Sequence, residues 1–208
     1  MTIPTTDLLR LTQWLSPAFP VSGYAYSHGL EAAMAAGPVT DAASTGAWVA
    51  CVLRRGAGAL DAWAIRAVLG GADPAEIAGI LRARAGSAER SEEMEAMGAA
   101  FCRTTAEMGG APLPDLPLPV ALAIRAAGMD ARVVATLYLQ AFAAQLVGAA
   151  TRFLPLGQAA AQAVLANLHP VIDAVAARSD PAPPGGGALL AELDAMAHER
   201  LQPRIFRT

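Results

Sequence analysis

Residues 130–154 read DARVVATLYLQAFAAQLVGAATRFL, and this stretch decides the fold. Asp130 is a favourable N-cap residue and Pro155 cannot continue a helix, so these two residues bound one long helix. At about 1.5 Å per residue this helix is about 37 Å long. It carries no charge from Val133 to Thr151, so it is long and apolar enough to cross a membrane. Because it also contains two glutamines and many alanines, we predict a central core helix instead, and no membrane association.

The rest of the chain shows the same helical periodicity, interrupted by glycine and proline. Of its 208 residues 54% are hydrophobic, many of them alanine, which is the best helix former. The chain is too short for two ordinary domains. We therefore predict an all-α fold, a single-domain helical bundle of about eight to ten helices over residues 1–208. The expected helices cover about residues 8–15, 24–36, 41–69 with a bend at 56–58, 74–81, 87–108, 120–127, 130–154, 157–178 and 188–200. Residues 157–178 form either a helical hairpin, of 157–168 and 170–178, or one helix kinked at Pro170.

The last thirty residues form a distinct C-terminal arm. Residues 179–187 are rich in proline and glycine, so we predict that the arm is flexible from about residue 179. Residues 188–200 form an amphipathic helix, and Pro203 ends it. The apolar stripe of this helix consists of Leu189, Leu190, Leu193, Met196 and Ala197. The basic tail at 204–208 is expected to be loosely tethered and to expose its two apolar side chains. The alternative is that Phe206 packs against this protein's own core.

Composition excludes several kinds of chemistry. The chain has 15 basic and 18 acidic residues, a net charge of −3. It therefore lacks the excess of positive charge that is typical of proteins that bind nucleic acid. It contains no lysine, so a P-loop lysine and a Schiff-base lysine are both excluded. Cys51 and Cys102 have no C-x-x-C spacing and are expected to be small core residues. This cysteine usage, with no signal-peptide pattern at the N-terminus, predicts a cytoplasmic protein.

The remaining polar residues form no motif of a known enzyme or metal site. His28, His169 and His198 are far apart in the sequence, and their spacing does not predict a metal site. We therefore predict no catalytic residue, no metal site and no tightly bound cofactor. Three carboxylates lie near apolar residues and are candidates for partial burial: Glu31, Asp61 and Asp173.

A run of charged residues occupies the first half of the expected helix at 87–108. It consists of Glu89, Arg90, Glu92, Glu93 and Glu95. Such a run is typical of a solvated helix face, and we predict one here. The alternative is a docking surface for a basic partner.

Two segments stand out from this helical pattern. Residues 16–31 read SPAFPVSGYAYSHGLE, in which two prolines exclude a helix before Gly23 allows a turn. Residues 152–158 read RFLPLGQ and directly follow the central helix. Neither segment contains an obvious nucleophile, base or metal cluster.

Both segments resemble those of the UreF urease accessory proteins. The first family segment has the form S-P-x-x-P-x-G-x-[FY]-x-x-S-x-G-L-E. It is matched by Ser16, Pro17, Pro20, Tyr24, Ser27, Gly29, Leu30 and Glu31, while Ser22 takes the place of the first glycine. The second has the form P-L-G-Q-x-x-G-Q. It is matched by Pro155, Leu156, Gly157, Gln158 and Gln162, with Ala161 instead of glycine. A charged helix leading to a glycine, from Arg90 to Gly98, and a short tail like residues 204–208 are also similar to the family.

The resemblance implies an all-α homodimer that acts in urease maturation. UreF proteins bind the accessory protein UreD, called UreH in some systems, and recruit the GTPase UreG. The assembly delivers nickel to apo-urease, and UreF is thought to couple the nucleotide state of UreG to nickel release. The resemblance implies no catalytic residue, and nickel is handled by the complex. Deleting the tail at 204–208 is then expected to leave the fold intact and to weaken binding to UreD.

The candidate partner-binding residues come from the two segments and the tail. They are Tyr24, Tyr26, Ser27, His28, Glu31, Arg152, Gln158, Arg204, Phe206 and Arg207. A tyrosine offers a large contact area and a hydroxyl group. Tyr24 and Tyr26 serve either binding or the core, and burial is expected for Tyr26 because Leu30 shares its face. Arg152 either binds a partner's carboxylate or phosphate or stabilises the end of its helix.

A rival hypothesis from another class is a helical-bundle enzyme acting on a small molecule. Tyr26, His28 and Glu31 would form its polar site. Neighbouring genes for urease subunits and a P-loop GTPase, or co-purification with their products, would separate the two hypotheses.

Overall fold

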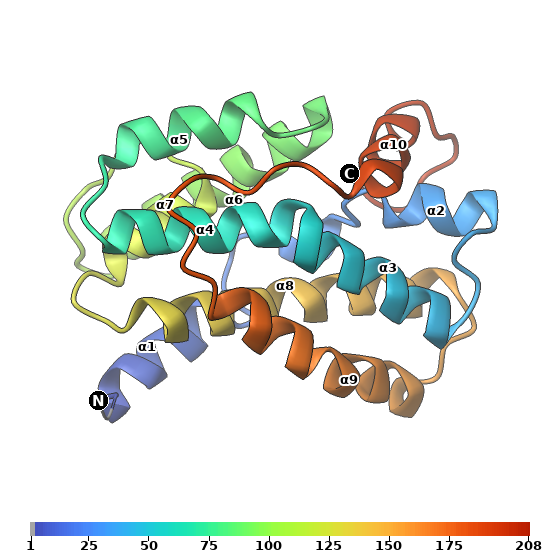
Figure 1. Cartoon of the computed structure of the whole chain (residues 1–208), viewed down its shortest axis with the longest axis horizontal. Coiled ribbons are helices and arrows are strands. Elements are labelled where there is room, and N and C mark those ends of the chain that lie inside the picture. The colour runs from blue at the N-terminus through green and yellow to red at the C-terminus, as the bar shows by residue number, and fades with distance from the viewer. Residues whose placement is uncertain (1–2) are drawn as a thin grey trace.

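The computed structural model describes residues 3–208, and every regular element in that range is helical (Figure 1). The elements are α1 (Thr5–Trp14), the short 3-10 helix η1 (Gly23–Ala25), α2 (Leu30–Ala36), α3 (Ala42–Arg55), α4 (Ala57–Leu69), α5 (Pro74–Ala83), α6 (Ala88–Glu107), α7 (Leu118–Arg125), α8 (Ala131–Phe153), α9 (Gln158–Ala176) and α10 (Leu189–His198). The predicted all-α fold is confirmed.

Helix α8 lies at the centre of the bundle, as the sequence predicts. The Asp130 side chain caps it by accepting from the Val133 N–H at 3.1 Å, and Leu154 is extended before Pro155. It packs against α9, α4, α3 and α2. Helices α8 and α9 are both long and apolar enough to cross a membrane, but 56% and 44% of their most apolar windows are buried inside the bundle. About half of each window is therefore packed within the protein, as in the core helices of a bundle.

Most predicted helix boundaries are confirmed within a few residues. Asp73 caps α5, with Pro74 in the first helical position, and Ser87 caps α6. The bend expected at residues 56–58 is the junction of α3 and α4 at Gly56. Helix α9 continues through Pro170 to Ala176, so this region is one helix rather than a hairpin.

One expected helix begins later than predicted. We expected a helix from about Tyr24 to Ala36, but the chain forms only η1 there and α2 begins at Leu30. The reason is the backbone of His28 and Gly29, whose φ angles of 59° and 81° are left-handed and cannot belong to an α-helix. A Cβ on Gly29 would lie 2.6 Å from the backbone nitrogen of Ala195, so this glycine allows α10 to pack directly on the turn.

The C-terminal arm crosses one face of the bundle before it reaches α10. In Figure 1 it runs from the end of α9 along α4 to the region of α2 and α6. Its backbone is held on the way, because the Gly187 N–H donates to the Arg55 carbonyl at 3.1 Å and Arg84 donates to the Pro184 carbonyl at 2.9 Å. Helix α10 then packs against α2, α6 and α3.

Candidate partner-binding site

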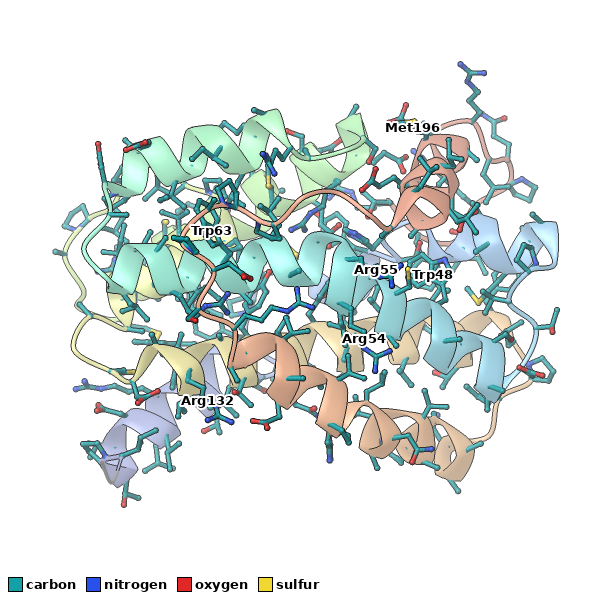
Figure 2. All side chains as sticks on the ribbon, viewed as in Figure 1. Trp48, Arg54, Arg55, Trp63, Arg132 and Met196 are labelled. Atoms are coloured by element: carbon teal, nitrogen blue, oxygen red, sulfur yellow. The ribbon has the colours of Figure 1, made fainter. Side chains whose placement is uncertain are left out.

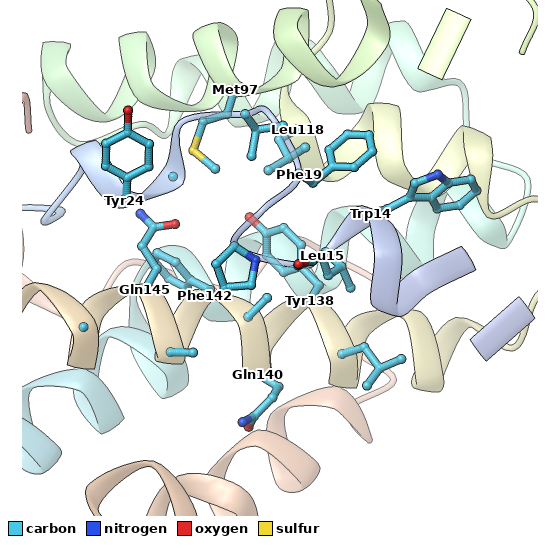
Figure 3. Close-up of a pocket in the computed structure, with 18 of the residues that line it drawn as sticks. Trp14, Leu15, Phe19, Tyr24, Met97, Leu118, Tyr138, Gln140, Phe142 and Gln145 are labelled. Atoms are coloured by element: carbon cyan, nitrogen blue, oxygen red, sulfur yellow. The ribbon is translucent and has the colours of Figure 1, made fainter. Parts of the chain in front are cut away.

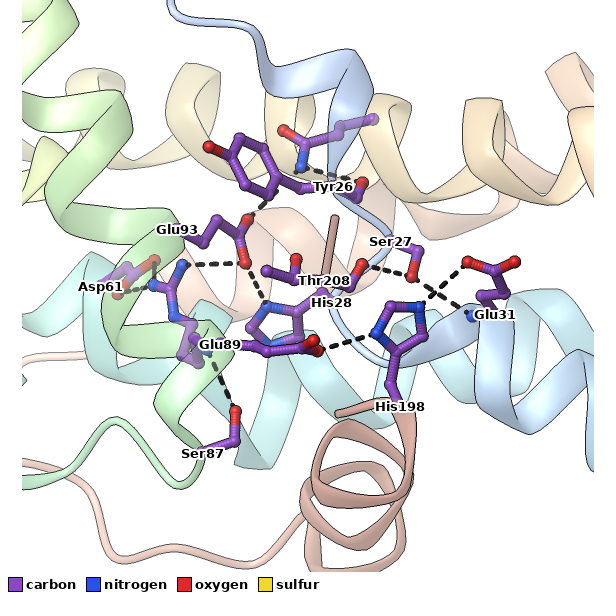
Figure 4. A network of polar contacts seen from close by, with 12 residues as sticks. Tyr26, Ser27, His28, Glu31, Asp61, Ser87, Glu89, Glu93, His198 and Thr208 are labelled. Carbon is purple, nitrogen blue, oxygen red and sulfur yellow. Dashed lines mark hydrogen bonds and ion pairs between the residues drawn. The ribbon is translucent and has the colours of Figure 1, made fainter. Parts of the chain in front are cut away.

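The tail at residues 204–208 docks onto the segment around α2, and Figure 4 shows its residue Thr208 beside Ser27. Glu31 accepts hydrogen bonds from the backbone N–H groups of Ile205, at 2.7 Å, and Phe206, at 2.9 Å. The Ser27 N–H and hydroxyl both donate to the main-chain oxygen of Thr208, at 2.6 and 2.5 Å. The Arg207 N–H donates to the carbonyl of Ala25 at 2.8 Å. The first distinctive segment of the sequence and its last residues therefore form one unit.

The expectation that the tail is loosely tethered and exposes Phe206 was wrong. Phe206 is only 3% exposed, and the Arg152 guanidinium lies over its ring, 4.4 Å from the centroid. The alternative named above, docking against this protein's own core, is confirmed. Ile205 is exposed, as expected. Glu31 is the physical reason, because a fully buried carboxylate needs hydrogen-bond donors and the tail supplies two of them.

His198, the last residue of α10, joins this unit from the other side. Its Nε2 lies 3.0 Å from Glu31 Oε2, and its Nδ1 lies 2.7 Å from Glu89 Oε2. Arg204 donates to the other oxygen of Glu89 at 2.6 Å. His198 is completely buried, and Glu31 and Glu89 are nearly so. We call His198, Glu31, Glu89 and Arg204 the His198 cluster.

A second charged group continues from the His198 cluster along α6. His28 Nδ1 lies 3.1 Å from Glu93 Oε2. Arg90 donates to both oxygens of Asp61, at 2.8 and 2.6 Å, and the Tyr138 hydroxyl donates to the same carboxylate at 2.6 Å. These buried charges are therefore paired or hydrogen-bonded, as burial requires.

The charge run on α6 is not the solvated face that we predicted. Glu89, Arg90 and Glu93 are buried, whereas Glu92 is exposed and Glu95 half-buried. The residues three and four apart share one face of the helix, and here that face points inward. The prediction was wrong because the partners of these charges, on α4, α8, α10 and the tail, are remote in sequence.

The paired charges shift the pKa values of this second group. Burial alone would raise the pKa of Glu93, but the hydrogen bond and charge of His28, followed by Arg90 and Gln145, outweigh it and lower that pKa. Burial would lower the pKa of Arg90, but Asp61 and Glu93 outweigh it and raise the pKa above its usual value. Burial first, and then the charge of Asp61, raise the pKa of Tyr138 well above its usual range. All three groups therefore keep their ordinary neutral-pH charge states.

The other sequence-predicted residues lie in different surroundings. Tyr26 is buried, as expected, whereas Tyr24 is 68% exposed. Arg152 donates to the Tyr24 carbonyl at 2.6 Å, so it connects the end of α8 with the first segment. Gln158 is the exposed first residue of α9 and makes no side-chain hydrogen bond within residues 3–208 to the residues around the tail. Of the three carboxylates expected to be partly buried, Glu31 and Asp61 are fully buried, whereas Asp173 is exposed.

Sequence reasoning missed the orientation of α10. We call Leu189, Leu190, Leu193 and Met196 the outer face of α10; their exposed fractions are 64%, 75%, 50% and 47%. The helix buries instead Ala191, Ala195 and His198. The Trp48 indole N–H donates to Asp194 at 3.0 Å and fixes the helix against α3, while Met196 points away from it (Figure 2). The apolar stripe was visible in the sequence, but its direction was not.

An apolar cavity of about 750 Å³ opens between α1, the segment after it, α6 and α8 (Figure 3). Aromatic and aliphatic side chains dominate its lining, including Trp14, Phe19, Met97 and Phe142. Ala141, Ala144 and Gly148 of α8 also line the cavity, and so does Tyr24. Within residues 3–208 no group of three or more histidine, cysteine, aspartate or glutamate side chains is arranged to hold a metal ion.

These features are typical of an all-α protein that binds other proteins. Its buried charges hold its own segments together, and a row of apolar side chains on α10 points outward. The UreF family model matches residues 39–169. The chain belongs to the UreF family of urease accessory proteins, which are maturation factors rather than enzymes, so the rival enzyme hypothesis is excluded.

Three relatives illustrate how far the similarity extends. The urease accessory protein UreF of Cereibacter sphaeroides strain KD131 is 52% identical over 206 residues, covering 97% of this chain and 98% of that protein. UreF of Jannaschia sp. strain CCS1 is 49% identical over 213 residues, covering 98% and 96%. UreF of Paracoccus denitrificans strain Pd 1222 is 44% identical over 212 residues, covering 99% and 98%. The similarity thus extends over nearly the whole chain.

Proposed function

We propose that this protein is a cytoplasmic adaptor of urease maturation that binds UreD and the GTPase UreG. It couples GTP hydrolysis by UreG to the delivery of nickel into apo-urease. Nickel is the cargo of the assembled complex, and the protein itself binds no cofactor tightly. Membership of the UreF family supports this role, and the outer face of α10 supports a protein partner most directly.

The outer face of α10 is the surface we assign to UreD. Its four large apolar side chains lie on one helix and are each about half exposed or more. Burying such side chains contributes about 1.5–3 kcal/mol each, so a partner that covers them gains binding free energy. Contiguous apolar surface of this kind is uncommon on proteins that have no partner. The tail adds exposed Ile205 and the cations Arg204 and Arg207, which suit an acidic margin on the partner.

The packing of α10 against the bundle favours binding of a partner protein. Its inner side is fixed by the His198 cluster, by Trp48 and by the close packing of Ala195 on Gly29. A partner therefore meets a helix that is already in position and loses less conformational entropy on binding. Tyr24, which is largely exposed and is held by Arg152, is the second candidate contact.

The test is a pull-down of UreD with a double variant, Leu190→Glu and Leu193→Glu. Two charges on the outer face should weaken UreD binding by at least about tenfold, since each one replaces apolar burial by desolvation of a carboxylate. The matched control is Leu9→Glu on α1, where the leucine is 64% exposed, between Leu190 at 75% and Leu193 at 50%, but lies on another face. This control should bind UreD normally, and both proteins should keep the melting temperature of the wild type. Unchanged UreD binding by the double variant would contradict the assignment.

A further inference from the structure

The contacts of His198 suit an imidazole ring that donates from both nitrogens. Each ring nitrogen faces a carboxylate oxygen, at 2.7 Å for Glu89 and at 3.0 Å for Glu31. An ionised carboxylate only accepts hydrogen bonds, and a neutral imidazole has one donor and one acceptor nitrogen. With both carboxylates ionised, only the doubly protonated ring satisfies both contacts. Because His198 has no exposed surface, solvent does not relieve a mismatch.

The charges around His198 balance only when the ring is protonated. Glu31 faces it from α2 and Glu89 from α6, while Arg204 of the tail pairs with Glu89. Two carboxylates are thus matched by two cations. The other charged neighbours are engaged elsewhere: His28 with Glu93, Arg90 with Asp61, Arg207 with Glu92, and Glu199 with the N–H of Ala88. Loss of the His198 proton leaves a nitrogen lone pair against a buried carboxylate oxygen, with one negative charge in excess.

Glu31 links the protonation of His198 to the docking of the tail. The same carboxylate binds His198 and both tail N–H groups, of Ile205 and Phe206. An unmatched Glu31 is best relieved by reaching water, and it does so only when α10 and the tail move away. Glu31 therefore connects the position of α10 to that of residues 204–208.

We propose that His198 is a proton-dependent latch that fastens α10 and residues 204–208 to α2 and α6 when its ring is doubly protonated, and releases them when it loses a proton. The latch would regulate how the outer face of α10 is presented, and in that respect it rests on the proposed function. Its physical basis lies entirely within this chain.

The direction of the pH effect follows from proton linkage. An exposed histidine releases its proton at about pH 6.5, whereas the closed latch requires the proton. Above that pH the closed state holds one proton more than the open state, so rising pH favours opening. Because one proton is involved, the equilibrium constant for opening should rise with pH by at most about tenfold per pH unit. Toward pH 6 and below it should level off.

Hydrogen exchange of the full-length protein, detected by mass spectrometry, tests the latch. The readout is the protection factor of the tail amides of Ile205 and Phe206, corrected for the intrinsic pH dependence of exchange, between pH 6 and 8.5. Wild type should lose protection as the pH rises above about 6.5, by up to about tenfold per pH unit. His198→Gln should have low protection at every pH. His169→Gln, which removes an exposed histidine from α9, should behave as wild type.

Several outcomes would overturn the latch. They are a wild-type tail whose protection is independent of pH or falls toward low pH, and a pH dependence that persists in His198→Gln. Nitrogen NMR of wild type with labelled histidine gives a test that needs no variant: at pH 7.5 the buried ring should show two protonated nitrogens, and a neutral tautomer in the closed state would refute the proposal. Both measurements are made without a partner, so their failure leaves UreD binding standing, and failure of the UreD pull-down leaves the latch standing.

Discussion

At the scale of single residues, Gly98 shows how closely two segments approach. A Cβ at this position on α6 would lie 1.8 Å from the carbonyl oxygen of Leu116 and 2.7 Å from the backbone nitrogen of Leu118. We expect Gly98→Ala to lower the free energy of unfolding by about 3 kcal/mol or more, because backbone atoms have to move. Urea denaturation followed by circular dichroism measures this change.

The control for this prediction is Gly79→Ala in α5. No atom lies within 4 Å of a Cβ built at Gly79, which is also inside a helix. Alanine there should raise the free energy of unfolding by up to about 1 kcal/mol, because it is the better helix former. Similar effects of the two substitutions would show that the approach at Gly98 is not as close as described.

Glu93 carries a pH-dependent part of the stability. Its pKa is lowered in the folded protein, so its ionised form stabilises the fold above the unfolded pKa of about 4.3, and this contribution is lost as the pH falls through the lower folded value. Glu93→Gln should lower the free energy of unfolding at pH 7 by about 1–3 kcal/mol. The difference from wild type should shrink below about pH 4.

Urea denaturation at several pH values measures the Glu93 effect. Glu92→Gln is the matched control: this neighbour is 63% exposed and should change the free energy of unfolding by less than about 0.5 kcal/mol at any pH. A deficit of Glu93→Gln that grows toward acid pH would have the wrong sign and would contradict the pairing with His28 and Arg90.

At the scale of elements, the docked tail reverses the expectation for its deletion. Without residues 204–208, Glu31 and Glu89 lose the donors that the tail supplies. Breaking buried charged contacts costs roughly 3 kcal/mol or more, so the melting temperature should fall by about 5–10 °C for a chain of this size. Ile205→Ala removes only an exposed side chain and should melt as wild type. A deletion variant that melts like wild type would show that the tail is not docked in solution.

Helix α10 illustrates what periodicity tells and what it omits. The stripe of Leu189, Leu193 and Met196 predicted a helix correctly, since spacing along one face is a local property. The side that packs inward depends on Glu31 and Glu89, which come from α2 and α6. A single sequence does not reveal such pairings over more than a hundred residues. The same reason explains why the buried side of α6 was predicted as solvated.

At the scale of the whole molecule, local signals were sufficient for the architecture but not for the site. Asp130, Pro155 and the glycine and proline breaks predicted the all-α bundle and its central helix. The first segment was correctly singled out, and Tyr26 was correctly expected to be buried. Its junction with His198 and the tail was not predictable, because no sequence spacing relates residues 27–31 to residues 198–208.

We predict a homodimer in solution. The cavity between α1, α6 and α8 is apolar, and Ala141, Ala144 and Gly148 of α8 line it, which allows a second copy to approach closely. Light scattering should give twice the monomer mass, and Ala144→Glu should shift the protein to monomer. Leu190→Glu, on the outer face of α10, should remain a dimer. A wild-type monomer at high micromolar concentration would contradict the prediction.

The docking of the tail also has a consequence for biosynthesis. Residues 204–208 leave the ribosome after every residue that they contact, including Ser27, Glu31 and Glu89. Until then these buried polar groups lack partners, and α10 lacks the support that fixes its direction. The order of translation therefore makes the docking of α10 and the tail a late step in the folding of this chain.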